Sequence, residues 1–210
     1  MKINTFNNIN IEHLQSDNDK MLSFFSQLFA ENTVSQSNIV QLTSMFKTIG
    51  LKKNDYFIQE NQLGSTLGFV FSGMLRGYII DLNGNEATIR FLQKYDLISG
   101  SFGVNTNSDL NIQCIDDSII FEVSSTEMDH FVKNNSWLTI YFNSFFIQVH
   151  RTIIKRMASY IQMSGKERYK LFLKDYPNLI NKIPQYYVAN YLGITPIQLS
   201  RIRKEISKGK

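Results

Sequence analysis

The segment from 195 to 204 carries polar side chains at spacings that suit contact with nucleic-acid bases and phosphates. Gln198 and Arg201 lie three residues apart, so they share one face if the segment is helical. An arginine pairs bidentately with guanine O6 and N7, and a glutamine amide can pair with adenine, so both are candidates for base contacts. The other candidates are Pro196 and Ile197 for a thymine methyl group, and Thr195, Ser200, Arg203 and Lys204 for phosphates.

The surrounding residues predict two short helices joined by a sharp turn. Gly193 suits the turn because glycine reaches positive φ without a Cβ clash. Thr195 is a favourable N-cap and Pro196 suits the first helical position, so the second helix should begin there. Apolar residues recur at helical spacing on both sides: Val188, Ala189 and Leu192 before the turn, and Leu199, Ile202 and Ile206 after it. This predicts a helix-turn-helix with a basic outward face, whereas a hairpin that packs only for stability needs a merely polar one.

Charge is distributed unevenly along the chain. Residues 1–149 hold 9 Lys or Arg against 15 Asp or Glu, a net charge of −6, whereas residues 150–210 hold 13 against 3, a net charge of +10. An acidic front and a basic tail indicate that the tail faces a polyanion. Phosphate contacts supply most sequence-independent DNA affinity, and the candidates are Lys166, Arg168, Lys170, Lys174, Lys182, Arg203 and Lys204.

The length and composition favour a cytoplasmic, soluble protein. A chain of 210 residues can bury one good core and a smaller second one. No apolar stretch approaches the length that a membrane helix needs, so no membrane partner is expected. The first residues lack the charged-then-apolar pattern of a secretory signal.

Residue patterns that would indicate an enzyme or a metal site are missing from the sequence. The single cysteine, Cys114, rules out an internal disulfide and disfavours a cysteine-ligated metal. His13, His130 and His150 show no His-x-His spacing of the kind that metal-binding sandwiches use. The sequence also lacks a nucleophile elbow, a phosphate loop and a paired acid motif. We therefore predict no catalytic residues, no cofactor and no metal.

The remaining sequence predicts helices, then strands, then one long helix. Helical apolar spacing covers 9–31 and 34–49, and short β-branched and aromatic segments follow from about residue 51. These segments, separated by turn signals, are typical of an antiparallel sandwich or barrel, and comprise 56–60, 67–80, 87–92, 110–115 and 118–123.

Residues 136–163 predict a long helix with two apolar faces. One face can pack on the chain's own sandwich. The other, marked by Ile140, Ile147 and Ile154, is most simply covered by a second copy of the helix. We therefore predict a homodimer through this helix; the alternative is a helix buried wholly within one chain. Ser164 and Gly165 should end the helix and mark a hinge.

This order of elements resembles the Crp/Fnr family of bacterial transcription regulators over nearly the whole chain. The residues that carry the resemblance are 194–204, similar to the family's recognition helix, 70–78 with Gly84, similar to the first hairpin of its cyclic-nucleotide-binding sandwich, and Tyr95-Asp96, at its Gly-Asp turn. The resemblance implies an α+β fold with N-terminal helices and a jelly-roll-like antiparallel sandwich, a long dimerisation helix and a small C-terminal helix-turn-helix domain. It also implies a homodimer with recognition helices in successive major grooves, half-sites being about 34 Å apart.

The sequence departs from the family at the cyclic-nucleotide cassette. Nucleotide-binding members place a glutamate for the ribose and an arginine for the phosphate there, at positions that fall near Gly100 and Ser108 in this chain. Residues 99–109 contain no cation, and a buried phosphate is poorly stabilised without one. Control by cyclic AMP is therefore disfavoured.

These observations predict a homodimeric, sequence-specific DNA-binding regulator with three parts. The expected parts are a sensor domain with its N-terminal helices over 1–135, the dimerisation helix over 136–163 and the DNA-binding domain over 164–210. Double-stranded DNA is the expected partner, the resemblance adds RNA polymerase, and an unidentified small-molecule effector stays open. The alternative is a ligand-sensing or protein-interaction module with a vestigial DNA-binding tail.

Overall fold

The computed structural model describes residues 16–30, 34–101, 106–177 and 182–208. The helices described are α2 (Asp17–Leu28), α3 (Gln36–Thr43), α4 (Ser125–Asn134), α5 (Ser136–Gln162), α6 (Gly165–Asp175), α7 (Gln185–Leu192) and α8 (Pro196–Lys208). The strands are β1 (Lys47–Leu51), β2 (Tyr56–Ile58), β3 (Thr66–Ser72), β4 (Leu75–Ile80), β5 (Glu86–Leu92), β6 (Leu97–Ile98), β7 (Asn111–Cys114) and β8 (Ser118–Ser124). The predicted α+β class and antiparallel sandwich are confirmed.

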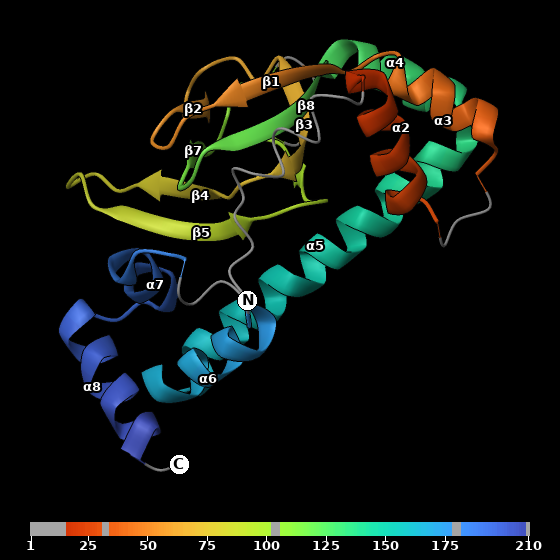
Figure 1. The fold of residues 1–210 in the computed structure, drawn as a ribbon. Coiled ribbons are helices and arrows are strands. Elements are labelled where there is room, and N and C mark those ends of the chain that lie inside the picture. Colours follow the sequence, from red (N-terminus) through yellow and green to blue (C-terminus); the bar gives the residue numbers. More distant parts are fainter. Residues whose placement is uncertain (1–15, 31–33, 102–105, 178–181, 209–210) are drawn as a thin grey trace.

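The strands form two four-stranded antiparallel sheets packed as a sandwich (Figure 1). One sheet has the order β1-β8-β3-β6 and the other has the order β2-β7-β4-β5. The chain crosses between the sheets at the β3–β4 connection, where Gly73 has φ +93°. A Cβ at Gly73 would lie 2.3 Å from Ser118 Oγ, so this close approach requires glycine. The strand β5 lies at one edge of the second sheet.

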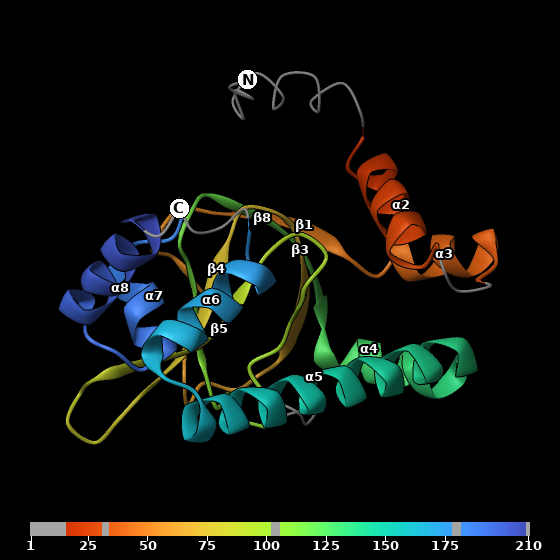
Figure 2. The same cartoon turned by 90° about the horizontal axis from the view of Figure 1, so that it is seen from below.

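The long helix α5 connects the two helical ends of the molecule. It starts beside α2, α3 and α4 and runs past the sandwich to α6, α7 and α8 (Figures 1 and 2). Leu138 and Phe142 at its start are buried in an aromatic cluster with α2 and the first sheet. Within that cluster Phe24 meets Phe121 edge-on, with ring centroids 5.2 Å apart. This packing fixes the beginning of α5 against the sandwich.

The prediction of one helix over 34–49 is wrong at its C-terminal end. The helix α3 ends at Thr43, and β1 begins at Lys47. Thr48 and Ile49 are β-branched, and the whole strand pairs with β8 in the register Lys47↔Glu122 to Leu51↔Ser118. An available partner strand therefore decides the conformation here, which periodicity within 34–49 does not reveal.

Three other elements were not predicted, and the first helix is shorter than expected. The strand β6 and the helices α4 and α6 were missed, and the part of the predicted 9–31 helix that is described spans Asp17–Leu28. The break expected at Ser164 and Gly165 is present, but a new helix begins there at once. Ser164 and Glu167 form a capping box at its start, and hydrogen bonds from Ser164 hold the pKa of Glu167 below its usual range. Residues 9–15 lie outside the described residues.

Candidate nucleic-acid interface

The C-terminal helices α7 and α8 are joined by a turn at Gly193, as predicted. Gly193 has φ +63°, and the Ile194 amide donates to Ala189 O at 3.0 Å, which ends α7. The inward face of the helix pair is buried as expected, since Val188, Ala189, Leu192 and Leu199 are each at most 2% exposed. The turn and this small core hold α8 at a fixed angle to α7.

Replacing Gly193 with alanine should destabilise the protein by about 1–2 kcal/mol, because an L-residue resists the left-handed conformation. The new Cβ would also lie 3.0 Å from Tyr160 Cε1 on α5. Urea unfolding should show the loss. Gly50→Ala is the matched control, since nothing lies within 4 Å of a Cβ at Gly50. An equal loss in both variants would contradict the assigned role of Gly193.

The start of α8 is fixed by two reciprocal hydrogen bonds. Thr195 Oγ1 accepts a hydrogen bond from the backbone N–H of Gln198 at 3.1 Å. In return, the side-chain Oε1 of Gln198 accepts one from the backbone N–H of Thr195 at 2.8 Å. The predicted N-cap is therefore present. Thr195 and Gln198 have the spacing of a capping box, so Gln198 completes the cap, and this bears on its expected role as a base contact. A bidentate contact with adenine uses both atoms of the amide, so Gln198 would have to share or leave its contact with Thr195 to read that base.

The outward face of α8 carries the remaining candidates for nucleic-acid contact. Ile197 is 67% exposed, and Thr195, Pro196, Gln198, Ser200, Arg201 and Lys204 are exposed as well. Arg203 is half-buried beside Tyr169 of α6: burial raises the pKa of Tyr169, and the Arg203 guanidinium opposes that rise. All eight candidates thus lie on one helix, with Arg203 at the edge of the exposed face.

The other basic residues of the tail divide into exposed and structural ones. Lys170, Lys174 and Lys182 are exposed. Lys166 pairs with Glu205 of α8 at 2.9 Å, a surface pair that contributes little to stability. Arg168 instead donates to Leu192 O at 2.9 Å and Met163 O at 2.6 Å, so it links the ends of α7 and α5. Of the seven cations predicted to contact phosphates, Arg168 is therefore engaged within the chain instead.

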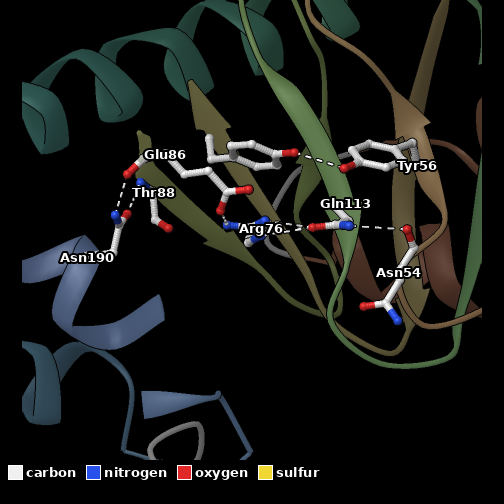
Figure 3. Close-up of polar contacts among 8 residues, drawn as sticks. Asn54, Tyr56, Arg76, Glu86, Thr88, Gln113 and Asn190 are labelled. Carbon is white, nitrogen blue, oxygen red and sulfur yellow. Dashed lines mark hydrogen bonds and ion pairs between the residues drawn. The ribbon is translucent and has the colours of Figure 1, made fainter. Parts of the chain in front are cut away.

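The C-terminal helices dock on the edge strand β5. Asn190 Oδ1 accepts from the Thr88 amide, and Asn190 Nδ2 donates to Glu86 O, as Figure 3 shows. Arg156 of α5 donates to Ile89 O, to Thr88 O at 2.8 Å and to Tyr191 O at 3.0 Å. An edge strand presents unpaired backbone groups, and these two side chains satisfy several of them. Neither residue was predicted to have this role, because neighbouring residues do not indicate that a side chain will bond to a strand far away in the sequence.

A buried arginine strengthens the same contact. Arg76 of β4 is 2% exposed, and its guanidinium lies 3.9 Å from the ring centroids of both Tyr78 and Tyr187 of α7. It pairs with Glu86 at 2.6 Å and donates to Gln113 at 3.1 and 2.7 Å (Figure 3). A buried charge requires such partners. The C-terminal helices therefore contact the second sheet through both aromatic packing and hydrogen bonds.

Gly100 and Ser108, the positions at which the resemblance implies side chains that bind a cyclic nucleotide, are closely packed in this structure. A Cβ at Gly100 would lie 2.2 Å from Ser108 Oγ, so the two positions face each other without space for a larger side chain. Ser108 Oγ donates to Leu110 O at 2.6 Å and is buried. Residues 102–105 of this segment lie outside the described residues.

One face of α5 is apolar and exposed. Ile140, Ile147, Ile154 and Ile161 follow one another at intervals of seven, and their exposed fractions are 66%, 54%, 52% and 83%. The second apolar face expected from the sequence is therefore present and is left uncovered by this chain's own described residues. Among those residues, no helix is long and apolar enough to cross a membrane, and no group of three or more metal-ligating side chains occurs.

Comparisons with known proteins define the fold. No family model matches the chain, and no curated protein matches it. Among solved structures, FixK2 from Bradyrhizobium japonicum is similar with a TM-score of 0.72 and 15% identity, covering 78% of this chain and 85% of its own. A CooA variant from Carboxydothermus hydrogenoformans gives 0.66 and 14%, covering 87% and 83%. The catabolite activator protein of Thermus thermophilus gives 0.55 and 15%, covering 87% of both chains. The chain therefore has the fold of these proteins.

Proposed function

We propose that this protein is a homodimeric, sequence-specific DNA-binding transcription regulator of Crp/Fnr type that is not controlled by cyclic AMP. The observation that carries the proposal is α8, whose inward face is buried while its outward face presents Gln198, Arg201 and Lys204 to solvent. A helix held this way can enter a major groove. The fold, shared with FixK2 and the catabolite activator protein, supports the proposal independently of these side chains.

The dimer is proposed through the exposed isoleucines of α5. A repeat of seven residues places Ile140, Ile147, Ile154 and Ile161 in one stripe, which a second copy of the helix would cover. We accordingly assign 136–163 to dimerisation, 1–135 to the sandwich with its N-terminal helices and 164–210 to DNA binding. Such a regulator acts in the cytoplasm and has RNA polymerase as a further partner.

Independence from cyclic AMP is supported by the tight packing at Gly100 and Ser108. Neither a carboxylate for the ribose nor a guanidinium for the phosphate is present at these positions, and the space between them is filled. A nucleotide phosphate would therefore lack its usual bidentate partner there.

Replacing Arg201 with alanine should cost about 1–3 kcal/mol of DNA-binding free energy and relax the preference at one base position. The purified protein and its variant are compared on DNA upstream of the protein's own gene, at two salt concentrations, with excess random duplex and no added ligand. Lys204→Ala is the control: as a phosphate contact, it should weaken binding to all sequences alike and reduce the salt dependence.

An unchanged base preference in the Arg201→Ala variant would show that Arg201 does not contact a base. Absence of any salt-dependent DNA affinity in the unmodified dimer would contradict the proposal as a whole. It would favour the alternative, a ligand-sensing or protein-interaction module whose DNA-binding tail is vestigial.

A further inference from the structure

A second apolar row lies on the exposed side of α5, beside the stripe of isoleucines. Phe146, Ile153 and Tyr160 follow one another at intervals of seven, and their exposed fractions are 43%, 45% and 40%. Each residue turns a helix by about 100°, so this row lies about 100° around α5 from Ile147 and Ile154. The exposed apolar face of α5 is therefore wider than one stripe, and a second copy of the helix would cover both rows.

His150 lies between the two rows. Residues three and four positions away are neighbours on a helix surface, and for His150 these are Phe146, Ile147, Ile153 and Ile154. Each of the four is at least 43% exposed, and His150 is exposed as well. A second copy that covers this surface would therefore remove the imidazole from water.

A dimer of parallel α5 helices would bring the two His150 side chains face to face. In such a two-stranded pair, each residue of the central row meets its counterpart across the two-fold axis. The parallel orientation places α6, α7 and α8 of both copies at the same end of the dimer, as binding to one duplex requires (Figure 1). Asn143 precedes His150 by seven residues and is exposed. An asparagine in this row fixes the register of a parallel pair.

No carboxylate of α5 can compensate a positive charge on His150. The helix contains no Asp or Glu, and its other charged residues are Arg151, Lys155 and Arg156. Arg156 points to the second sheet, where it donates to Thr88 O at 2.8 Å. Arg151 and Lys155 are exposed cations, so in a dimer they add to the positive charge around the seam.

The charged groups that the sandwich places against α5 lie on another side of the helix. Arg90 and Asp96 meet α5 at Phe145 and Val149. Helical geometry turns these two positions by about 100–140° away from His150. Two protonated imidazoles that face each other in the seam would therefore repel each other and lose their hydration, with no carboxylate on the same face of α5. Neutral imidazoles carry neither cost.

We propose that His150 makes dimerisation pH-dependent: the dimer forms while the two imidazoles are neutral and dissociates as they are protonated. This pH dependence rests on the proposed dimer through α5. Histidine in water changes charge near pH 6.5, so the single chain takes up a proton as the pH falls past that value, whereas the dimer resists it. Because two protons leave for each dimer formed, the dissociation constant should rise about 100-fold from pH 7.5 to pH 5.5.

The test is analytical ultracentrifugation of the full-length protein over a range of concentrations at both pH values. The unmodified protein should show the rise of about 100-fold. His150→Gln keeps a polar side chain but cannot take up a proton, so its dissociation constant should change by less than about threefold. His130→Gln is the matched control, since His130 is an exposed histidine of α4, and it should keep the full pH dependence. Circular dichroism at both pH values shows that each variant is folded.

The possible results separate the pH dependence from the dimer itself. A dissociation constant that is the same at both pH values overturns the role of His150 and leaves the proposed dimer intact. The role is also overturned if His150→Gln keeps the pH dependence, or if His130→Gln loses it. A protein that is monomeric at both pH values instead contradicts the proposed dimer, and the role of His150 falls with it.

Discussion

Replacing Ile147 and Ile154 together with aspartate should convert the protein to a monomer and lower its affinity for a two-half-site DNA by about 10²–10⁴-fold. Both side chains are half-exposed on α5, within the stripe repeated at intervals of seven. In a dimer, four carboxylates would meet in an apolar seam, where burial of unpaired charge is strongly unfavourable. The DNA affinity falls because the second half-site is no longer held at a high effective concentration. Light scattering after size-exclusion chromatography gives the mass, and a titration with labelled duplex gives the affinity.

The matched control places aspartates one residue later, at Gln148 and Lys155, which are exposed beside the stripe. This variant should remain a dimer. If the Ile147→Asp/Ile154→Asp protein is still a dimer, the proposed seam is contradicted. The dimer would then form through another surface, and the exposed isoleucines would need a different explanation. Loss of the dimer in both variants would show that charge on α5, rather than this stripe, is responsible.

Replacing Arg156 with methionine should lower the free energy of unfolding by about 2–3 kcal/mol and loosen the C-terminal helices from the second sheet. The guanidinium joins three carbonyl groups from β5 and α7 and stacks on Tyr191, 3.9 Å from the ring centroid. Methionine keeps the apolar stem and removes every donor. Urea unfolding measures the stability, and amide hydrogen exchange in β5 and α7 should show the local opening.

Two further variants separate the hydrogen-bonding role from charge alone. Lys155→Met removes the neighbouring cation of α5, which is exposed, and should leave stability and exchange unchanged. Arg156→Lys keeps the charge but cannot present a planar fork to three acceptors, so it should recover only part of the loss. Full recovery with lysine would mean that the charge, rather than the geometry, joins the domains.

Local chemistry made the C-terminal helices predictable. Gly193 adopts the left-handed conformation that its position required, and Thr195 caps α8 as expected. The apolar pattern correctly assigned Leu199 to the inside and Arg201 to the outside. These features are set by residues within one or two helical turns of each other, so a short stretch of sequence contains all the information they need.

Features that depend on distant partners were not predictable in the same way. The strand β1 forms because β8 is available to pair with it, although its residues continue an apparent helical pattern. Arg168 was expected at the phosphates, and instead it donates to the ends of two helices.

Periodicity and composition were enough to predict the class of the fold, the basic character of the tail and the two apolar faces of α5, because they show which side of an element avoids water. Which polar side chains bond to other parts of the chain became clear only from the folded protein. Asn190 and Arg156 donate to or accept from the backbone of β5, whereas the Nε of Arg90 is buried without a hydrogen-bond partner among the described residues. A side chain's chemistry is fixed by its type, but its partners are set by segments far along the chain, and those are brought together only by folding.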